Sequence, residues 1–407
     1  MARPIRTLLF STLYPSSAQP GHGIFVETRL RELLGSGEVE AKVVAPVPWF
    51  PSTNKRWGAY AKMAATPLRE VRNGIDVAHP RYPLLPKVGM SVAPLLLAAW
   101  ARRAVQRAID DGFDFDLIDA HYFYPDGVAA AMLAHWFRRP LVITARGSDV
   151  NLIATHALPQ RMMRWAAGRA AACIGVSSAL AGAMRNLGMP EWKIHVMRNG
   201  VDLDRFKPVS QAQARVAIRQ EGNPLLLSVG NLVALKGHEL CIDALALLLP
   251  AYPEAQLVIV GEGPLHAELL RHARSRGVES KVTLAGQIDN ADLALWYSAA
   301  DFLLLASSRE GWPNVLLEAL ACGTPVISTR VGGIPEVIRE ELAGNLIATR
   351  DGYSLAEAIA KRLASRPTND RAAVRRYAES FGWAETSRAQ VELFSAIVGG
   401  VCGAQHA

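Results

Sequence analysis

Short apolar runs alternate with helical stretches along nearly the whole chain of 407 residues. In the first half, the runs typical of buried strands are Thr7–Thr12, Ala41–Ala45, Leu117–Ala120, Leu141–Thr144 and Ala172–Val176. The helical patterns between and after them are Ile24–Leu34, Ala93–Ile109, Gly127–Trp136, Gln160–Ala171 and Ala179–Leu187. Such alternation predicts a parallel, doubly wound sheet. The proline-rich stretch between Pro46 and Pro94 is too long for an ordinary loop, so we expect an insertion or extra strands there.

The second half repeats this design. The predicted strands are Pro224–Val229, Gln256–Val260, Lys281–Leu284, Phe302–Ala306 and Val326–Ser328. The predicted helices are His238–Leu249, Leu265–Arg276, Ala291–Ala299, Asn314–Cys322, Leu355–Ala364, Arg371–Ser380 and Trp383–Ile397. The break between the halves falls near Met189–Asp202, where Pro and Asn-Gly punctuate the chain. We therefore predict an α/β protein of two Rossmann-like, doubly wound domains that face each other across a cleft. The last residues, Val398 to Ala407, are expected to be frayed.

Charge and cysteine content narrow the functional classes. Residues 1–195 carry 23 Lys+Arg against 14 Asp+Glu, whereas residues 196–407 carry 21 against 23. A basic first half fits an anionic substrate or an acidic membrane surface. No helix-turn-helix, zinc or RNP pattern is present, so we predict no nucleic-acid partner. The four cysteines are far apart and lack metal spacing, which indicates reduced thiols in a cytoplasmic protein.

Membrane contact is a separate question. No run reaches 18 apolar residues, so we predict no membrane-spanning segment. The segment Val88–Arg107 is apolar with trailing arginines. It fits an interfacial helix or a core helix, and the pattern favours the core helix.

One stretch, Ser307–Glu336, concentrates the chemistry. It reads as a loop, a helix and a strand that follow the strand Phe302–Ala306. The loop places backbone N–H groups at a helix N-terminus, which suits a phosphate. Glu310 lies in this loop, and Glu318 lies about a turn inside the helix. The helix dipole alone accounts for a glutamate at position 318, but not for the surrounding pattern.

Glu310 and Glu318, separated by seven residues, resemble the paired glutamates of the retaining glycosyltransferases of the GT-B fold, family 4, group 1. The resemblance covers nearly the whole chain. It implies an acceptor-binding domain in residues 1–190, a nucleotide-sugar-binding domain in residues 191–380 and a C-terminal helix in residues 381–407 that returns to the first domain. It also implies hexosyl transfer from a UDP- or GDP-type sugar to a glycan or lipid-linked, anionic acceptor in bacterial surface-polysaccharide biosynthesis.

The resemblance extends to a donor loop, Gly230-Asn231-Leu232 through Lys236-Gly237, whose basic residues hold a diphosphate. Asn231 stands where most members have Arg, so Arg309 or the helix dipole has to compensate. By the same resemblance Glu318 accepts hydrogen bonds from ribose, and Glu310 faces the transferred sugar. The implied donor-binding set is Gly23, Gly230, Asn231, Lys236, Gly263, Trp312, Pro313, Asn314, Val315, Leu316 and Glu318. For Gly23 and Gly263, a plain turn is an alternative explanation.

The implied catalytic set is Glu310, Arg146 and His121. Arg146 stands where many members have the His of an H-G-x-D segment. An arginine cannot act as a base, but it can hold developing negative charge or an acceptor phosphate. His121 ends a predicted strand, and Asp126 and Asp149 lie on similar loops. A same-face displacement without a covalent glycosyl-enzyme fits these residues.

No Asp-x-Asp pattern occurs in a plausible loop, so we predict a metal-independent enzyme with no cofactor beyond the nucleotide sugar as co-substrate. Two alternatives stay open. Asn231 and Arg146 at expected functional positions are compatible with a non-catalytic sugar-nucleotide-binding subunit. A sugar-nucleotide epimerase of similar shape is the other, although the paired glutamates argue against it. The expected location is the cytoplasm, with peripheral contact at the inner face of the plasma membrane.

Overall fold

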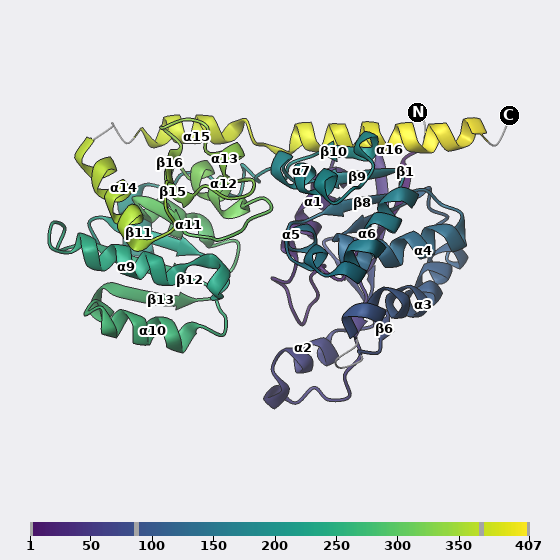
Figure 1. The fold of residues 1–407 in the computed structure, drawn as a ribbon, viewed down its shortest axis with the longest axis horizontal. Helices are drawn as coiled ribbons and strands as arrows, with labels where there is room; N and C mark the ends of the chain where they lie inside the picture. Colours follow the sequence, from purple (N-terminus) through teal and green to yellow (C-terminus); the bar gives the residue numbers. More distant parts are fainter. Residues whose placement is uncertain (1–2, 85–88, 366–369, 405–407) are drawn as a thin grey trace. The chain divides into compact units, whose positions relative to one another are not determined.

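The computed structural model describes residues 3–84, 89–365 and 370–404. The chain divides into two compact units (Figure 1). Unit 1 comprises residues 1–198 and 384–407, and unit 2 comprises residues 199–383. The first division falls eight residues after the predicted boundary at 190, and the second falls three residues after the one at 380.

Unit 1 is built on an eight-stranded sheet with the order β10-β9-β8-β7-β1-β2-β5-β4. Its strands are β1 (Ile5–Phe10), β2 (Val39–Val44), β4 (Arg69–Arg72), β5 (Ile75–Ala78), β7 (Leu117–His121), β8 (Leu141–Ala145), β9 (Ala172–Gly175) and β10 (Ile194–Val196). All neighbours run parallel except β4 and β5, which form an antiparallel hairpin. Two further strands, β3 (Val47–Pro48) and β6 (Arg81–Tyr82), pair separately.

The helices of unit 1 are α1 (Ile24–Leu34), α2 (Ala59–Ala65), α3 (Gly89–Asp110), α4 (Val128–Phe137), α5 (Ser148–Asn151), α6 (Ala157–Arg169), α7 (Ser178–Asn186) and nearly all of α16 (Trp383–Ala404). The C-terminal helix α16 packs on the sheet beside α1. Its residues Val391 and Phe394 share one apolar cluster with Leu33 of α1, Leu117 of β7 and Val142 of β8. Unit 1 therefore contains both ends of the described chain.

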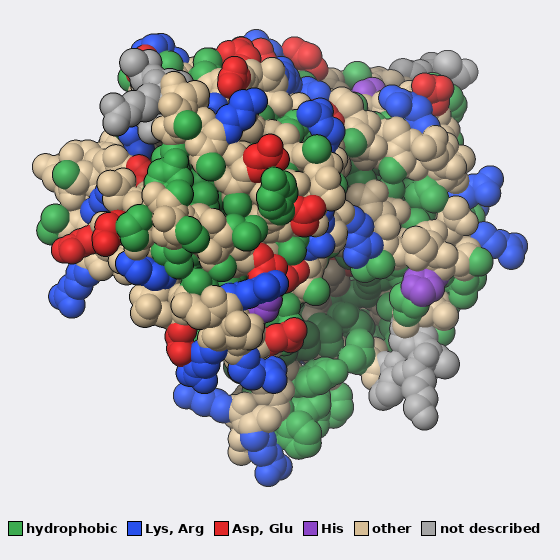
Figure 2. Space-filling view, turned by 60° about the vertical axis from the view of Figure 1, so that its left-hand side comes forward, with side chains coloured by type: hydrophobic (Ala, Val, Ile, Leu, Met, Phe, Trp, Pro, Cys, Tyr) green, Lys and Arg blue, Asp and Glu red, His purple; other side chains and the backbone are tan. Residues whose placement is uncertain are grey.

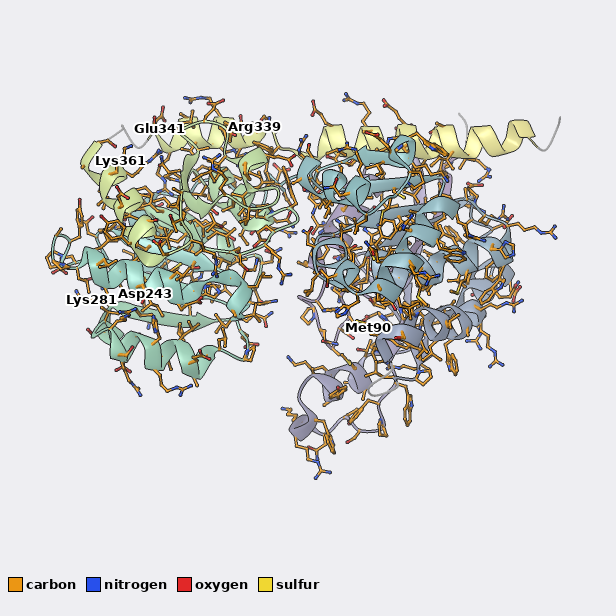
Figure 3. All side chains as sticks on the ribbon, viewed as in Figure 1. Met90, Asp243, Lys281, Arg339, Glu341 and Lys361 are labelled. Atoms are coloured by element: carbon orange, nitrogen blue, oxygen red, sulfur yellow. The ribbon has the colours of Figure 1, made fainter. Side chains whose placement is uncertain are left out.

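Unit 2 contains a six-stranded parallel sheet with the order β13-β12-β11-β14-β15-β16. Its strands are β11 (Leu225–Val229), β12 (Gln256–Val260), β13 (Val282–Gly286), β14 (Phe302–Leu305), β15 (Val326–Thr329) and β16 (Gly344–Ile347). Its helices are α8 (Gln211–Ile218), α9 (His238–Leu248), α10 (His266–Ser275), α11 (Leu293–Ala299), α12 (Asn314–Ala321), α13 (Ile334–Val337), α14 (Gly352–Ser365) and α15 (Arg371–Glu379). A buried apolar cluster joins α9 and α14 to β11, β12 and β14. Figure 3 labels Asp243 on α9. This residue pairs with His272 of α10 and with Arg276 just after it, both at 2.7 Å.

The two sheets share the strand order around their first strand. In unit 2 the first strand, β11, lies between the second, β12, and the fourth, β14, which is the 3-2-1-4-5-6 order of the Rossmann fold. In unit 1 the first strand, β1, likewise lies between β2 and β7. Connections leave the two sides of such a first strand in opposite directions, so a crevice opens outside its carboxyl end. The two crevices, at β11/β14 and at β1/β7, are where ligands are expected.

The predicted α/β class is confirmed, and most predicted elements lie within a few residues of the observed ones. The extra strands expected between Pro46 and Pro94 are β3 to β6. The segment Val88–Arg107 forms a core helix, since Leu97, Ala98, Ala101 and Val105 of α3 are fully buried, while Val88 lies outside the described residues. The prediction of a frayed end was wrong for the residues up to Ala404, because α16 continues to that residue.

Two other observations bear on the sequence predictions. Cys173, Cys241 and Cys322 are buried free thiols, and the side chain of Cys402 is outside the described set. Within the described ranges, no helix combines the length and apolar character needed to cross a membrane.

Candidate active site

In unit 2 the loops that follow β11 and β14 meet at the crevice. Lys236 ends the short 3-10 turn Ala234–Lys236 after β11, and Glu310 lies in the loop after β14. The Lys236 Nζ and Glu310 Oε1 atoms are 2.6 Å apart. Ser307 Oγ donates to the same carboxylate oxygen at 2.7 Å, and the Ser308 amide donates to the Leu235 carbonyl at 2.9 Å. Two residues predicted from separate motifs are thus direct partners.

The glycines of this region allow close backbone packing. A Cβ atom at Gly261 would lie 2.0 Å from the Gly230 carbonyl oxygen, and one at Gly263 would lie 2.5 Å from the Leu232 carbonyl oxygen. The Leu232 amide donates to the Glu262 carbonyl at 2.9 Å across the same contact. The stem of Lys236 packs directly over Gly230. These contacts explain Gly230 and Gly263 as backbone spacers that shape the loop, without requiring a ligand.

Helix α12 begins at Asn314, as predicted, but only part of its predicted cradle has a free amide. Pro313 has no N–H, and the Leu316 amide already donates to the Pro313 carbonyl at 3.0 Å. Among the described residues, none accepts from the amides of Asn314 and Val315. The Trp312 indole is buried and donates to the Asn199 carbonyl at 2.9 Å. Asn314 and Val315 are therefore the residues of this set whose N–H groups can reach an anion.

Glu318 lies one turn into α12, where its carboxylate is held by a tyrosine. The Tyr297 hydroxyl donates to Glu318 Oε2 at 2.7 Å. Burial raises the pKa of Glu318 to about 7, although the Tyr297 hydrogen bond and the charge of Arg205 oppose this rise. The residue as a whole is half-buried. Its second oxygen can accept one more donor once the proton is lost.

Three side chains that hold this site were missed by sequence reasoning. His238 bridges Ser228 Oγ (2.9 Å) and the Asn231 carbonyl (3.2 Å), and burial lowers its pKa to about 4, so it is neutral at physiological pH. Arg350 donates to the carbonyls of Ala306 (2.8 Å) and Ala234 (3.3 Å). Tyr297 is the third. Only His238, next to Lys236-Gly237, gave a sequence signal that could have been noticed.

Unit 1 has its own polar cluster at the carboxyl ends of β7 and β8. His121 ends β7, and its Nε2 lies 3.1 Å from Asp119 Oδ2. Arg146, directly after β8, hydrogen-bonds to His121 Nδ1 and lies over the Phe25 ring at 5.2 Å. An arginine only donates, so Nδ1 accepts and the ring proton is on Nε2, facing Asp119. Burial lowers the pKa of His121 to about 4, so this imidazole is neutral.

The remaining predicted residues of unit 1 have local structural partners. Asp126 accepts from the Thr12 amide at 2.6 Å and hydroxyl at 2.9 Å, which ties the loop after β1 to β7. Asp149 accepts from the amides of Phe123 and Gly147, both at 2.7 Å. A Cβ atom at Gly23, whose φ is +66°, would lie 2.3 Å from the Leu13 carbonyl oxygen. The turn explanation therefore accounts for Gly23.

Local strain marks this cluster. Tyr122, between His121 and the loop that holds Asp126, has φ at +85°, a conformation that costs energy for a bulky side chain. Its hydroxyl lies 2.8 Å from Ser148 Oγ. Strained residues of this kind are held by surrounding contacts and concentrate at functional positions.

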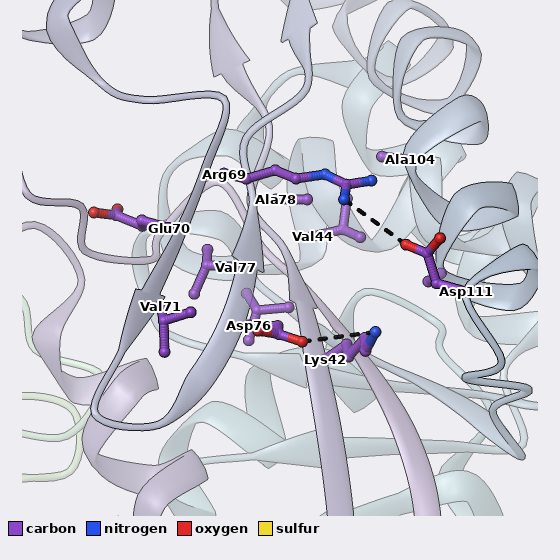
Figure 4. A pocket seen from close by; sticks show the side chains of 12 residues that line it. Lys42, Val44, Arg69, Glu70, Val71, Asp76, Val77, Ala78, Ala104 and Asp111 are labelled. Carbon is purple, nitrogen blue, oxygen red and sulfur yellow. Dashed lines mark ion pairs between the residues drawn. The ribbon is translucent and has the colours of Figure 1, made fainter.

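A separate pocket of about 370 Å³ lies at the β2–β5–β4 edge of unit 1 (Figure 4). Valines and alanines of β2, β5 and α3 form its walls. Two ion pairs line it, Arg69 with Asp111 (3.7 Å) and Lys42 with Asp76 (3.6 Å). It shares no residue with either crevice.

Known proteins with similar sequences agree with this architecture. A family model described as "Glycosyltransferase Family 4" matches residues 60–205, and one described as "Glycosyl transferases group 1" matches residues 210–381. TuaC of Bacillus subtilis, a glycosyltransferase whose name assigns it provisionally to teichuronic acid biosynthesis, is 31% identical over 365 residues, which cover 88% of this chain and 89% of TuaC. The chain belongs to the group 1 glycosyltransferases of family 4.

Other relatives of this family 4 glycosyltransferase have different names. D-inositol 3-phosphate glycosyltransferase 1 of Catenulispora acidiphila is 27% identical over 98% of this chain and 97% of its own length. Among solved structures, the sucrose-phosphate synthase of Thermosynechococcus elongatus superposes with a TM-score of 0.76 at 21% identity, over 98% and 100% of the two chains. Anabaena HepE in complex with UDP superposes with a TM-score of 0.72 at 22% identity, over 97% and 100%. These structures support the GT-B fold.

The Glu310 loop of this glycosyltransferase depends on a glycine. Gly332 has φ at +53°, and a Cβ atom there would lie 1.8 Å from the Glu310 carbonyl oxygen. Gly332→Ala should therefore displace the Glu310 loop in addition to straining its own backbone. Gly277→Ala is the matched control, because Gly277 has φ at +71° with open space around it. We expect Gly277→Ala to cost about 1 kcal/mol and Gly332→Ala clearly more in urea unfolding. Equal losses of unfolding free energy in the two variants would show that the contact between Gly332 and the Glu310 carbonyl is not tight.

Proposed function

We propose that this glycosyltransferase moves a hexosyl group from a UDP- or GDP-sugar to an anionic glycan or lipid-linked acceptor, with retention of anomeric configuration and without a metal ion. The reaction would belong to cell-surface polysaccharide biosynthesis at the inner face of the plasma membrane. The single observation that carries the proposal is the Lys236–Glu310 pair in the crevice of unit 2.

The pair supplies charge where a diphosphate is expected. Lys236 and Glu310 side chains are 20% and 11% exposed, so both groups are partly desolvated and their field is little screened. The amides of Asn314 and Val315 add the positive end of the α12 dipole. A diphosphate that binds here exchanges the Glu310 carboxylate for phosphate oxygens around Lys236 and leaves Glu310 free to face the sugar. The α12 amides then take the place of the positive charge that is missing at Asn231, and no metal ion is needed.

Glu318 suits the ribose. One carboxylate oxygen is already fixed by Tyr297, so the other has a defined direction before a ligand arrives. A ribose hydroxyl that donates to it replaces the water that burial has removed, and the carboxylate then becomes ionised. A fixed, desolvated acceptor of this kind selects a nucleoside with a free hydroxyl.

In the displacement itself, the bond between C1 of the sugar and the diphosphate oxygen breaks while the acceptor oxygen bonds to C1 on the same face. The acceptor proton passes to the departing phosphate oxygen. No protein base is needed, and the positive groups lower the barrier by stabilising the leaving diphosphate. Burial lowers the pKa of Arg146 to about 9, and its guanidinium is therefore still charged at pH 7.

His121 then has an indirect role. Both of its ring nitrogens are engaged, one by Asp119 and one by Arg146, so no lone pair is available to a substrate. We assign it to holding Arg146, in place of the direct catalytic role expected from its position. Arg146 is left as the group that meets sugar or acceptor.

The names of similar proteins favour part of this assignment. HepE is described in complex with UDP, with UDP and glucose, and with UDP-glucose, which supports a uridine donor as the first choice. TuaC carries a name from the biosynthesis of a surface polymer, teichuronic acid.

The donor class can be tested by thermal shift. A panel of UDP, GDP, ADP, TDP and their common sugars is run on wild type and on Glu318→Ala, with and without EDTA. A ligand at about 100 times its dissociation constant adds roughly 2.7 kcal/mol of stability. We expect one nucleotide to stabilise wild type but not the variant, with no effect of EDTA. If no nucleotide in the panel stabilises wild type, the proposed donor site is contradicted.

The epimerase alternative needs a separate measurement. Epimer formation from the donor alone, without an acceptor, would favour it.

The pH dependence of donor binding follows from Glu318. Because its pKa in the free protein is about 7, the carboxyl is mostly protonated at pH 6 and has to lose a proton when ribose binds. Affinity should therefore rise about tenfold from pH 6 to pH 8 and then level off. Calorimetry with the intact sugar nucleotide measures this, since its diphosphate diester does not titrate in that range. Glu318→Gln should flatten the profile, and an unchanged slope in that variant would assign it elsewhere.

Contact with an anionic membrane is best placed on the segment Trp49–Lys62 of unit 1. Trp49, Trp57 and Tyr60 are 58%, 44% and 45% exposed, and Phe50 packs between Trp57 and Tyr60. Arg56 lies over the Trp57 ring at 5.1 Å. Aromatic rings with cations beside them suit the interface of an anionic bilayer.

The charge around this segment is one-sided. Residues 41–69 contain five Lys or Arg and no Asp or Glu. The lobe at the lower end of Figure 2 accordingly shows hydrophobic and basic surface side by side. We therefore propose this segment as the surface that contacts the membrane.

The membrane contact is tested by flotation with vesicles of phosphatidylglycerol and phosphatidylcholine. Replacing Lys55 and Arg56 by Gln should weaken binding by about 2 kcal/mol, roughly thirtyfold, since each cation near an anionic surface contributes about 1 kcal/mol. Lys207→Gln with Lys361→Gln removes the same charge from exposed positions of unit 2 and is the control. Equal losses in both variants would indicate a net-charge effect and exclude a specific contact of this segment.

A further inference from the structure

A chain of buried hydrogen bonds joins the C-terminal helix to the Arg146 cluster. Gln390 of α16 donates from Nε2 to Asp119 Oδ2 at 3.2 Å. Its Oε1 accepts from Arg29 Nε of α1 at 2.9 Å. The same oxygen of Asp119 accepts from His121, which in turn accepts from Arg146. Gln390, Arg29, Asp119 and His121 are each 1% exposed.

The direction of every bond in this chain is fixed by chemistry. An arginine only donates and a carboxylate only accepts, so the Gln390 amide can point only one way. Asp119 is thus the acceptor for two neutral donors, Gln390 and His121, and each of these accepts from an arginine. The amide of a glutamine both accepts and donates, whereas a glutamate at that position could only accept. The arrangement requires a neutral amide there.

We propose that Gln390 is a positioning residue for glycosyl transfer, which holds Asp119 so that His121 keeps its Nδ1 lone pair for Arg146. This inference rests on the proposed role of Arg146 at the sugar. It means that the seating of α16 on unit 1 is coupled to the orientation of the Arg146 guanidinium.

This series of hydrogen bonds also includes residues close to both points where the polypeptide passes between unit 1 and unit 2. Arg29 Nη1 donates to the Met197 carbonyl at 3.1 Å, one residue before the division at Arg198. Gln390 lies six positions after the division at Ala384. Near each connection, therefore, one residue takes part in the series of hydrogen bonds that ends at Arg146.

The pKa of His121 is the quantity that shows whether Gln390 holds Asp119 in place. The charged groups that act on it are Asp119 on its own strand β7, Arg146 after β8 and Arg29 on α1, while α16 contributes the neutral Gln390. Burial and the two arginines disfavour the imidazolium, and Asp119 favours it. A negative charge in place of the Gln390 amide would favour the imidazolium, which has no lone pair for Arg146.

The experiment uses Gln390→Glu in the full-length protein. Titration of His121, followed by NMR with labelled histidine, should show its pKa raised by more than one unit. The acid limb of the pH profile for nucleoside diphosphate release, measured with the sugar nucleotide selected by the donor panel, should move to higher pH by the same amount. Below that limb kcat should fall by about ten- to a hundredfold, the scale of a misplaced catalytic group, with KM little changed. Gln390→Ala introduces no new charge, and it should shift the pKa of His121 and the acid limb in the same direction. This variant replaces Gln390→Glu in the experiment if Gln390→Glu does not fold.

Two controls separate positioning from stability. Phe394→Leu weakens the apolar seating of α16 without touching the polar chain, and Ser395→Glu adds a charge on the exposed side of the same helix. Neither should move the pKa of His121 or the acid limb. The proposal fails if both Gln390 variants leave these quantities at their wild-type values, or if Phe394→Leu shifts them equally. Turnover that survives Arg146→Ala while the His121 shift persists would overturn the role of Arg146 and leave the hydrogen-bond chain intact.

Discussion

The parallel pairing of β11 with both β12 and β14 is the constraint on which the proposed donor site depends. Because the connections leave β11 in two directions, the loops after β11 and β14 cannot fill the space between them with helix. Lys236 and Glu310 are brought together in that space although 74 positions separate them in the chain. Shifting the β14 register by one residue would turn its alternating side chains to the other face and carry the loop with them.

The same topology in unit 1 supports a different chemistry. There the crevice beside β1 is crossed by Asp126, whose carboxylate takes the Thr12 amide and hydroxyl, and the pKa of this buried acid rises to about 7. Asp149 does similar work for the turn that follows β8. These two acids accept from backbone amides, whereas Arg146 places a positive charge directly after β8. One unit therefore offers an ion pair and free amides, and the other a single arginine held by a neutral histidine.

Sequence reasoning reached the fold because βα periodicity is local, and it reached Lys236 and Glu310 because both sit in short motifs. It overlooked β16, whose four residues begin with Gly344, and α8, for which no element was predicted. It also counted Leu316 among the phosphate-facing amides, although a 3-10 bond at the helix start uses that amide. Gln390 had no signal at all, since 271 positions separate it from Asp119. Such partners are set by packing between distant elements, which no local pattern records.

The arginine at position 146 also changes how a departure from the family pattern should be judged. A buried guanidinium stays charged and so needs acceptors on several sides, which a histidine would not. Here the imidazole of His121 accepts from it, Asp119 fixes that imidazole, and Gln390 and Arg29 complete the balance around Asp119. A residue that had merely lost its role would be free to drift to solvent, because burying a charge with no use costs stability. The network around Arg146 therefore agrees with the proposal that its charge serves binding or transfer.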